Sequence, residues 1–154
     1  MTWNIEGFRR NTLNLTHYVN TYSPDFIFLS EPQIFSCDVA NAMSFLRGEY
    51  VYSLNSSDKY EHDLPLLSSK AYGGTMVLWR RQLDPYVTVY PNIPSTSFLP
   101  IIFQPPDHTT TIHICIYLPT SGLEDEFLLA LSELSSTLDQ LHFQYCLCFP
   151  PRRF

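Results

Sequence analysis

The sequence predicts a layered α/β fold, and three features carry that prediction. Short apolar segments alternate along the first fifty residues with segments in which apolar residues recur every three or four positions. The run Phe26–Leu29 is apolar throughout and follows the turn residues Ser23-Pro24-Asp25. Such a run is typical of a short strand buried on both faces in a largely parallel sheet. The resulting order of strand, helix, strand, helix indicates helices that cover a sheet.

Composition indicates one globular domain. With 154 residues, 45% of them hydrophobic and 16% charged, the chain is long enough to bury a real core. No apolar run reaches the length of a membrane span, and the first residues already resemble a strand. We therefore expect an intracellular protein, in the nucleus or cytoplasm, with no signal peptide and no membrane partner. Its four cysteines follow no metal or disulfide spacing and are expected to be reduced.

The charge balance argues against autonomous binding of nucleic acid by this chain. Nine Lys or Arg oppose fifteen Asp or Glu, which gives a net charge of -6. Only the doublets Arg9-Arg10, Arg80-Arg81 and Arg152-Arg153 stand out, and they are far apart in the sequence. A protein that binds a phosphate backbone through charge shows a basic patch instead.

The first half is predicted to hold three strands and two helices. A short strand ends at Trp3-Asn4-Ile5, and a helix capped by Asn11 or Thr12 stops before Pro24. A second helix runs from Asp38 to near Gly48, and a short strand follows it. The apolar spacing assigns the inner faces of the two helices to Leu15, Tyr18, Val19 and Tyr22, and to Val39, Ala42, Met43 and Leu46. The polar stretch 55–70 is expected to be a surface loop, in which the pair His62-Asp63 needs no catalytic explanation.

The second half is predicted to be strand-rich. Gly73-Gly74 precede a strand at Thr75–Trp79, which we expect to pair antiparallel with Tyr86–Tyr90. Pro100 removes a ladder donor and so favours an edge or bulged strand at Phe98–Phe103. In the strand predicted at Thr109–Pro119, successive side chains point to opposite faces of the sheet. One of its faces carries Ile112, Ile114, Ile116 and Leu118, and the other carries His113, Cys115 and Tyr117. A helix from Glu124 to about Leu141 and a strand over Gln144–Phe149 complete the prediction.

Two polar residues mark the carboxyl ends of predicted strands. Glu31 follows the run Phe26–Leu29, and Tyr117 closes the strand that Pro119 ends. Ligands of open α/β sheets bind at this end of the strands. A solvated acid and an edge-of-core tyrosine remain the plain alternatives, and His113 is expected to be a packed core histidine.

Four motifs occur in order: Trp3-Asn4, Glu31 in the sequence LSEP, Gly73-Gly74, and Tyr117-x-Pro119. Together they resemble the endonuclease/exonuclease/phosphatase family with the deoxyribonuclease I-like fold. The start WNIEG is similar to that of non-LTR (LINE-type) retrotransposon endonuclease domains, which are associated with reverse transcriptases. The resemblance implies an incomplete α/β/β/α sandwich, with a mixed sheet and flanking helices. It assigns residues 1–149 to the amino-terminal part of such a domain and 150–154 to a short tail.

The resemblance also implies a site for phosphodiester hydrolysis. Glu31 would be a ligand of Mg²⁺ or Mn²⁺, Asn4 would support that carboxylate or the metal, and Tyr117 would contact the scissile phosphate. The implied catalytic residues are therefore Tyr117 and Asn4, and the implied metal ligands are Glu31 and Asn4. DNA is the implied partner, whereas RNA or a small phosphate ester stays open. A missing carboxyl-terminal half or self-association would complete the fold.

Two further family motifs are absent from the sequence. Where the family has GDFN, the chain has Tyr145–Pro150 without Asp or Asn, and no SDH motif follows. The general-base histidine and the aspartate that orients it are then missing, so we expect a truncated domain that is inactive alone and binds metal weakly. With the second sheet supplied by the missing half, the apolar strands would lie uncovered. A non-catalytic interaction or structural remnant is the main alternative, and an unrelated α/β protein is the other.

Overall fold

The computed structural model describes residues 1–46, 48–56, 73–90, 97–118 and 124–146. The chain forms two compact units, Met1–Tyr117 and Leu118–Phe154. Most of the predicted loop 55–70, with the pair His62-Asp63, lies outside the described residues, as do Pro119 and residues 147–149 of the last predicted strand. The predicted site residues all belong to the first unit.

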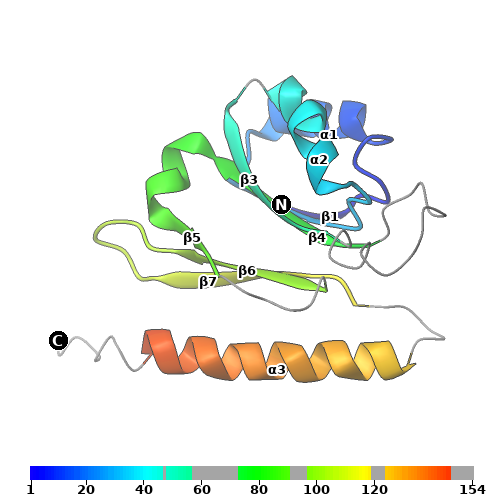
Figure 1. The fold of residues 1–154 in the computed structure, drawn as a ribbon. Helices are drawn as coiled ribbons and strands as arrows, with labels where there is room; N and C mark the ends of the chain where they lie inside the picture. Colours follow the sequence, from blue (N-terminus) through cyan, green and yellow to red (C-terminus); the bar gives the residue numbers. More distant parts are fainter. Residues whose placement is uncertain (47, 57–72, 91–96, 119–123, 147–154) are drawn as a thin grey trace. The chain divides into compact units, whose positions relative to one another are not determined.

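A four-stranded mixed sheet organises the first unit, and we call it the first sheet (Figure 1). Its order is β1 (Thr2–Asn4), β2 (Phe26–Ser30), β4 (Thr75–Arg80) and β3 (Tyr50–Asn55). The predicted mixed sheet is confirmed, but the expectation of a largely parallel sheet is wrong, because only β1 and β2 run parallel. The run at β2 is apolar because both of its faces are packed, and this holds whatever the direction of its neighbours.

Helices cover one face of the first sheet (Figure 1). These are α1 (Thr12–Tyr22), α2 (Ser36–Ala42) and the 3₁₀-helix η1 (Met43–Leu46). The second predicted helix thus consists of an α-helix whose last turn continues as a 3₁₀-helix. Their buried side chains and those of the sheet form one core, which includes Leu15, Val19, Ile27, Leu29, Val39, Met43, Leu46, Met76 and Leu78.

The outer part of α1 differs from the prediction. Tyr18 and Tyr22 are 44% and 68% exposed, so the buried stripe of α1 is narrower than the apolar spacing indicates. The two rings lie 5.5 Å apart, and Tyr18 lies 5.8 Å from the ring of Trp3. Aromatic pairs at such distances are stabilising while their polar tips remain in water. The helical period therefore identified the right side of α1 and overestimated its width.

The second sheet contains β5 (Val87–Val89), β6 (Phe98–Phe103) and β7 (Thr111–Ile116), all antiparallel in that order. The predicted pairing of β4 with β5 is wrong, since β5 pairs with β6. The 3₁₀-helix η3 (Arg81–Tyr86) replaces the expected turn and carries the chain from one sheet to the other.

Strand β6 lies in the centre of the second sheet, so the prediction of an edge or bulged strand was wrong. Pro100 is tolerated because the β5 ladder ends at the pair Val89 and Ile101. In the next pair, the carbonyl of Pro100 accepts the N–H of Tyr90 at 3.2 Å, and the return bond is missing because proline has no N–H. At the end of a ladder this loss is limited to one hydrogen bond.

The two sheets share a second core on the face of the first sheet opposite its helices. Its buried members are Val77, Trp79, Leu99, Ile101 and Cys115, with Phe26 and Phe28 packed against them. The expectation of uncovered strands is therefore wrong for β2, because this chain supplies a second sheet that covers it. His113 stacks on Phe26 with ring centres 5.7 Å apart, and burial lowers its pKa, as suits a packed neutral histidine.

The second unit contains α3 (Glu124–Cys146). Its first turn holds Glu124, Asp125 and Glu126, which favour the positive end of the helix dipole. The strand predicted to begin at Gln144 is wrong, because Gln144–Cys146 are helical. No Gly or Pro interrupts the sequence between Glu124 and Cys146, so nothing local stops the helix earlier. None of the described helices combines the length and the apolar character that a membrane crossing requires.

Candidate functional site

Two parallel strands bring Asn4 and Glu31 to the same rim of the first sheet. Asn4 is opposite Ser30 in the β1–β2 register, and Glu31 is the next residue of the chain. The carboxyl ends of parallel strands lie at one edge of a sheet, which is where the sequence predicted the site. The Nδ2 group of Asn4 donates a hydrogen bond of 3.1 Å to Glu31 Oε1.

The backbone around Glu31 is held from two sides. Glu31 adopts a left-handed conformation with φ 53°, which turns its side chain out of the strand direction. Its N–H donates to the carbonyl of Gly74 at 3.1 Å, and its carbonyl accepts from the N–H of Gly7 at 2.9 Å. A non-glycine residue at positive φ persists only where its surroundings hold it, and such residues cluster at functional sites.

The glycine pair at the start of β4 permits these close approaches. A Cβ on Gly74, whose φ is +86°, would lie 3.0 Å from the backbone carbonyl oxygen of Asn55. A Cβ on Gly73, with φ +58°, would lie 3.0 Å from Cε1 of Tyr117. The sequence marked the pair as a strand start and as one of the four family motifs, and the structure places it against both Glu31 and Tyr117.

Both oxygens of the Glu31 carboxylate receive side-chain donors. Gln33 Nε2 donates to Oε2 at 3.4 Å, opposite the bond from Asn4. Asn4 Oδ1 in turn accepts the backbone N–H of Glu6 at 3.3 Å, which fixes the orientation of the Asn4 amide. Sequence reasoning missed Gln33. Its position two residues after Glu31 was the available signal, but a polar residue in a turn is common.

The third predicted residue reaches the same carboxylate from the second sheet. Tyr117 follows β7, and its backbone N–H donates to the carbonyl of Ser97 at 2.6 Å. Burial, the negative charge of Glu31 and a hydrogen bond to that carboxylate all raise the pKa of Tyr117 above its ordinary value of 10.0. The phenol is therefore protonated at neutral pH and donates its hydrogen bond. We call the group Asn4, Glu31, Gln33 and Tyr117 the Glu31 cluster.

We expect Glu31→Gln to lower the pKa of Tyr117, because the substitution removes the negative charge that disfavours the phenolate. Burial, the largest cause of the shift, would remain, so the pKa should fall without dropping below its ordinary value. Ring ¹³C NMR during an alkaline titration measures it, with Tyr117→Phe identifying the resonance. An unchanged midpoint in Glu31→Gln would show that the two side chains do not interact in solution.

The donors of the cluster suit a hard cation only in part. Mg²⁺ binds oxygen ligands and often takes one or two carboxylates, with water and substrate phosphate completing its shell. Glu31 provides one carboxylate, and the Asn4 oxygen is engaged by Glu6 N–H. Within the residues that the structure describes, no three His, Cys, Asp or Glu side chains gather as a metal site. The cluster therefore fits a single-carboxylate site better than a closed metal site.

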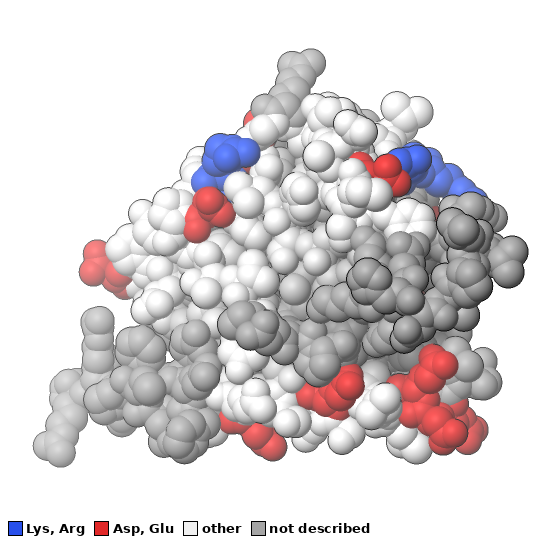
Figure 2. Space-filling view, in the orientation of Figure 1, with Lys and Arg blue, Asp and Glu red and all other residues white. Residues whose placement is uncertain are grey.

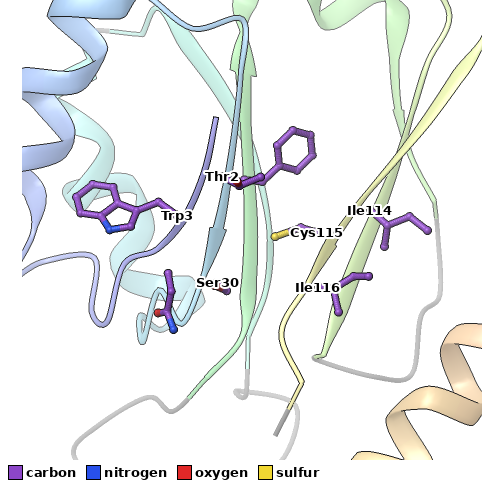
Figure 3. A pocket seen from close by; sticks show the side chains of 8 residues that line it. Thr2, Trp3, Ser30, Ile114, Cys115 and Ile116 are labelled. Carbon is purple, nitrogen blue, oxygen red and sulfur yellow. The ribbon is translucent and has the colours of Figure 1, made fainter. Parts of the chain in front are cut away.

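A small hollow lies beside the cluster, between the edges of the two sheets (Figure 3). It is lined by Thr2, Trp3, Asn4, Phe28, Ser30, Ile114, Cys115 and Ile116. Its volume of about 210 Å³ is below the roughly 300–1,000 Å³ typical of small-molecule pockets. None of the lining residues is charged, so the hollow has no cation that could attract a phosphate group.

The charge distribution matches the acidic composition. On the face shown in Figure 2, Lys and Arg atoms form two small separate spots among the described residues, not a continuous patch. Arg9 pairs with Asp38 at 2.9 Å, so a carboxylate neutralises this cation locally. The described surface in this view therefore offers no basic track for a nucleic-acid backbone.

Comparison with solved structures places the fold. Humanized TDP2 from D. rerio matches with a TM-score of 0.56 and 16% identity, over 91% of this chain and 57% of that one. AP endonuclease LMAP from Leishmania major matches with a TM-score of 0.57 and 18% identity, over 94% and 46%. A 3' phosphatase, NExo from Neisseria bound to a product DNA hairpin, matches with a TM-score of 0.53 and 14% identity, over 90% and 51%. The chain thus spans about half the length of these structures, and at such identities the likeness shows the fold alone.

Sequence comparison gives the family. No curated protein matches the chain. The family model described as endonuclease/exonuclease/phosphatase matches residues 1–151, which is nearly the whole sequence. The two packed sheets with helices on the outer face of the first sheet agree with an incomplete deoxyribonuclease I-like fold. The chain therefore belongs to the endonuclease/exonuclease/phosphatase family.

Proposed function

We propose that the Glu31 cluster is the metal and phosphate site of a phosphoesterase domain, of which this chain is the amino-terminal portion. The observation that carries the proposal is the convergence of Asn4 and Tyr117 on the carboxylate of Glu31. The three residues lie at the ends of β1, β2 and β7 and are up to 113 positions apart (117 − 4). A structural role alone does not require polar residues from two sheets to meet at one carboxylate.

Each side chain has a distinct proposed role. Glu31 would hold Mg²⁺ or Mn²⁺, and the ion would supply Lewis-acid stabilisation of charge on a phosphoryl oxygen. Asn4 and Gln33 orient the carboxylate through its two oxygens. Tyr117, kept protonated by its raised pKa, would donate a hydrogen bond to a phosphate oxygen. Asn4 is thus proposed as a positioning residue, because its own oxygen already accepts Glu6 N–H.

The proposal extends to substrate and origin. DNA is the proposed polymer, supported by the DNA hairpin in the matched NExo structure. The non-LTR retrotransposon type, with its associated reverse transcriptase, is supported by the sequence WNIEG at Trp3–Gly7. The absence of GDFN-like and SDH-like motifs from the sequence supports a truncated domain that is inactive by itself.

Isothermal titration with Mg²⁺ and Mn²⁺ tests the metal site. One carboxylate should bind weakly, with a dissociation constant near 1 mM or above, which corresponds to about 4 kcal/mol or less. Glu31→Gln should abolish the binding, because the amide keeps the shape and removes the charge. Glu6→Gln is the matched control, since only the backbone N–H of Glu6 contacts Asn4. Tight binding, or equal loss in both variants, would contradict the assignment.

A further inference from the structure

The Glu31 cluster joins two separate sheets, so its geometry depends on how the sheets are held together. Asn4 ends β1 of the first sheet and Glu31 follows β2, whereas Tyr117 follows β7 of the second sheet. The described strands form ladders within each sheet and none between the sheets. The hydrogen bond between Tyr117 and Glu31 therefore requires side-chain contacts that set the separation of the sheets.

One buried amide spans the two sheets close to the cluster. Asn55 is the last residue of β3 and is only 5% exposed. Its Nδ2 group donates a hydrogen bond of 3.1 Å to the carbonyl oxygen of Phe98, the first residue of β6. Burying an amide costs free energy unless it is hydrogen-bonded, so packing alone does not explain an asparagine at this position.

The strand pattern places Asn55 between the sheets and at the rim of the site. Side chains two residues apart in a strand point to the same face, so Asn55 shares a face of β3 with Val51. Val51 packs against the second core, which lies between the two sheets. The registers align Asn55, Thr75, Ser30 and Asn4 in one row across the first sheet. Asn55 therefore lies in the same last row as Asn4.

On the second sheet, the acceptor of the Asn55 bond adjoins the strand end that carries Tyr117. Phe98 is opposite Ile116 in the β6–β7 register. The carbonyl of the preceding residue, Ser97, accepts the backbone N–H of Tyr117 at 2.6 Å. The Asn55 amide thus holds β6 one residue away from the point at which this segment holds Tyr117.

On the first sheet, Asn55 adjoins the turn that holds Glu31. Asn55 is opposite Thr75, and the preceding Gly74 accepts the N–H of Glu31 at 3.1 Å. A Cβ on Gly74 would lie 3.0 Å from the carbonyl oxygen of Asn55, so the two backbones are in close contact. Asn55 is therefore next to the backbone anchors of both Glu31 and Tyr117.

A second contact between the sheets is a weaker one. Cys115 points toward the first sheet (Figure 3), and its Sγ donates to the carbonyl of Leu29 at 3.4 Å. Cys115 and Leu29 lie two residues before Tyr117 and Glu31, respectively. A thiol is a weak donor, whereas an amide is an ordinary one. We therefore expect Asn55 to contribute the larger part of the restraint.

We infer that Asn55 is a positioning residue of the Glu31 cluster, which holds the second sheet at the distance at which Tyr117 meets Glu31. It acts through the backbone of Phe98 and Ser97. Its consequence for phosphate rests on the proposed function, in which Glu31 holds the metal and Tyr117 donates to a phosphate oxygen. Such donors are effective when they are fixed in advance, so the separation of the sheets would decide whether both reach one phosphate.

Double-mutant cycles, measured by urea denaturation at neutral pH without metal, test the inference. Glu31→Gln, Tyr117→Phe and the double variant give the coupling between these two side chains. We expect Asn55→Leu, which keeps the branching at Cγ and removes the amide donor, to reduce this coupling by at least half. Asn55→Ala is a second background without added volume and should give the same reduction.

Val19→Ala is the matched control. Val19 is a buried residue of α1 in the core on the opposite face of the first sheet. Its truncation should lower stability without changing the contact between the sheets, so the coupling should keep its full value in this background. A residue that only stabilises the fold would behave like Val19, which separates a positioning role from general stability.

Reduced coupling in both Asn55 backgrounds, with full coupling in Val19→Ala, supports the inference. Coupling that stays above half of its original value in either Asn55 background would overturn it. So would an equal reduction in Val19→Ala, or no coupling in the unsubstituted chain. Loss of the native circular dichroism spectrum in both Asn55 variants would also overturn it and assign Asn55 to stability. Because the cycles contain no metal, their failure would leave a metal site at Glu31 standing, and a failed metal titration would leave the cycles standing.

Discussion

Purified and supplied with Mg²⁺, the isolated chain is expected to nick supercoiled plasmid at least about a thousandfold more slowly than an intact member of its family. A general base contributes typically about 10²–10⁴-fold, and the resemblance places that base in a motif that these 154 residues do not contain. Tyr117 cannot replace it, because a phenol with a raised pKa holds its proton at neutral pH. The remaining Glu31 cluster would position phosphate without activating water.

Plasmid relaxation on gels, calibrated with an intact relative, measures this rate. Any residual nicking should be insensitive to Glu31→Ala, since a contaminating nuclease would cause it. Nicking by the purified chain that requires Mg²⁺ and disappears in Glu31→Ala, but not in Glu6→Ala, would contradict the prediction. It would then place a working base among the residues of this chain.

The sequence predicted Asn4 and Glu31 because each stands at the end of a short strand that can be recognised from its apolar residues. The parallel pairing of β1 and β2 brings these two strand ends together. Tyr117 was found through the alternation of β7, although that alternation does not say which sheet the strand joins. Gln33 could not be found, because its role depends on the left-handed turn at Glu31.

The strand pairing was less predictable than the strands themselves. The polar segment between β4 and β5 suggested a hairpin, yet it forms a 3₁₀-helix that crosses to the second sheet. Trp79 Nε1 donates to Asp84 Oδ1 at 2.9 Å, which holds this helix against the end of β4. Such a contact joins residues five apart and leaves no periodic signal. Pro100 misled for a similar reason, because its cost depends on where the neighbouring strand ends.

Gly74→Ala is expected to destabilise the first unit by about 2–5 kcal/mol, the sum of about 1–2 kcal/mol for the left-handed backbone and about 1–3 kcal/mol for overpacking. The new Cβ would lie 3.0 Å from the carbonyl oxygen of Asn55, a backbone atom that cannot rotate away. Gly48→Ala is the matched control, because its φ of +75° is similar and its nearest neighbour is Arg81 Nη2 at 3.9 Å. It should cost only about 1–2 kcal/mol.

Urea denaturation of the two variants separates backbone strain from the clash, because only Gly74→Ala has both. The carbonyl of Gly74 accepts the N–H of Glu31, so a shift of the β4 start should also displace the carboxylate. Gly74→Ala should then weaken metal binding while Gly48→Ala leaves it unchanged. Equal destabilisation by both variants would mean that the structure yields at Asn55, and the glycine pair would then serve the backbone conformation alone. A larger effect at Gly74, joined with weaker metal binding, would tie the stability of this turn to the geometry of the Glu31 cluster.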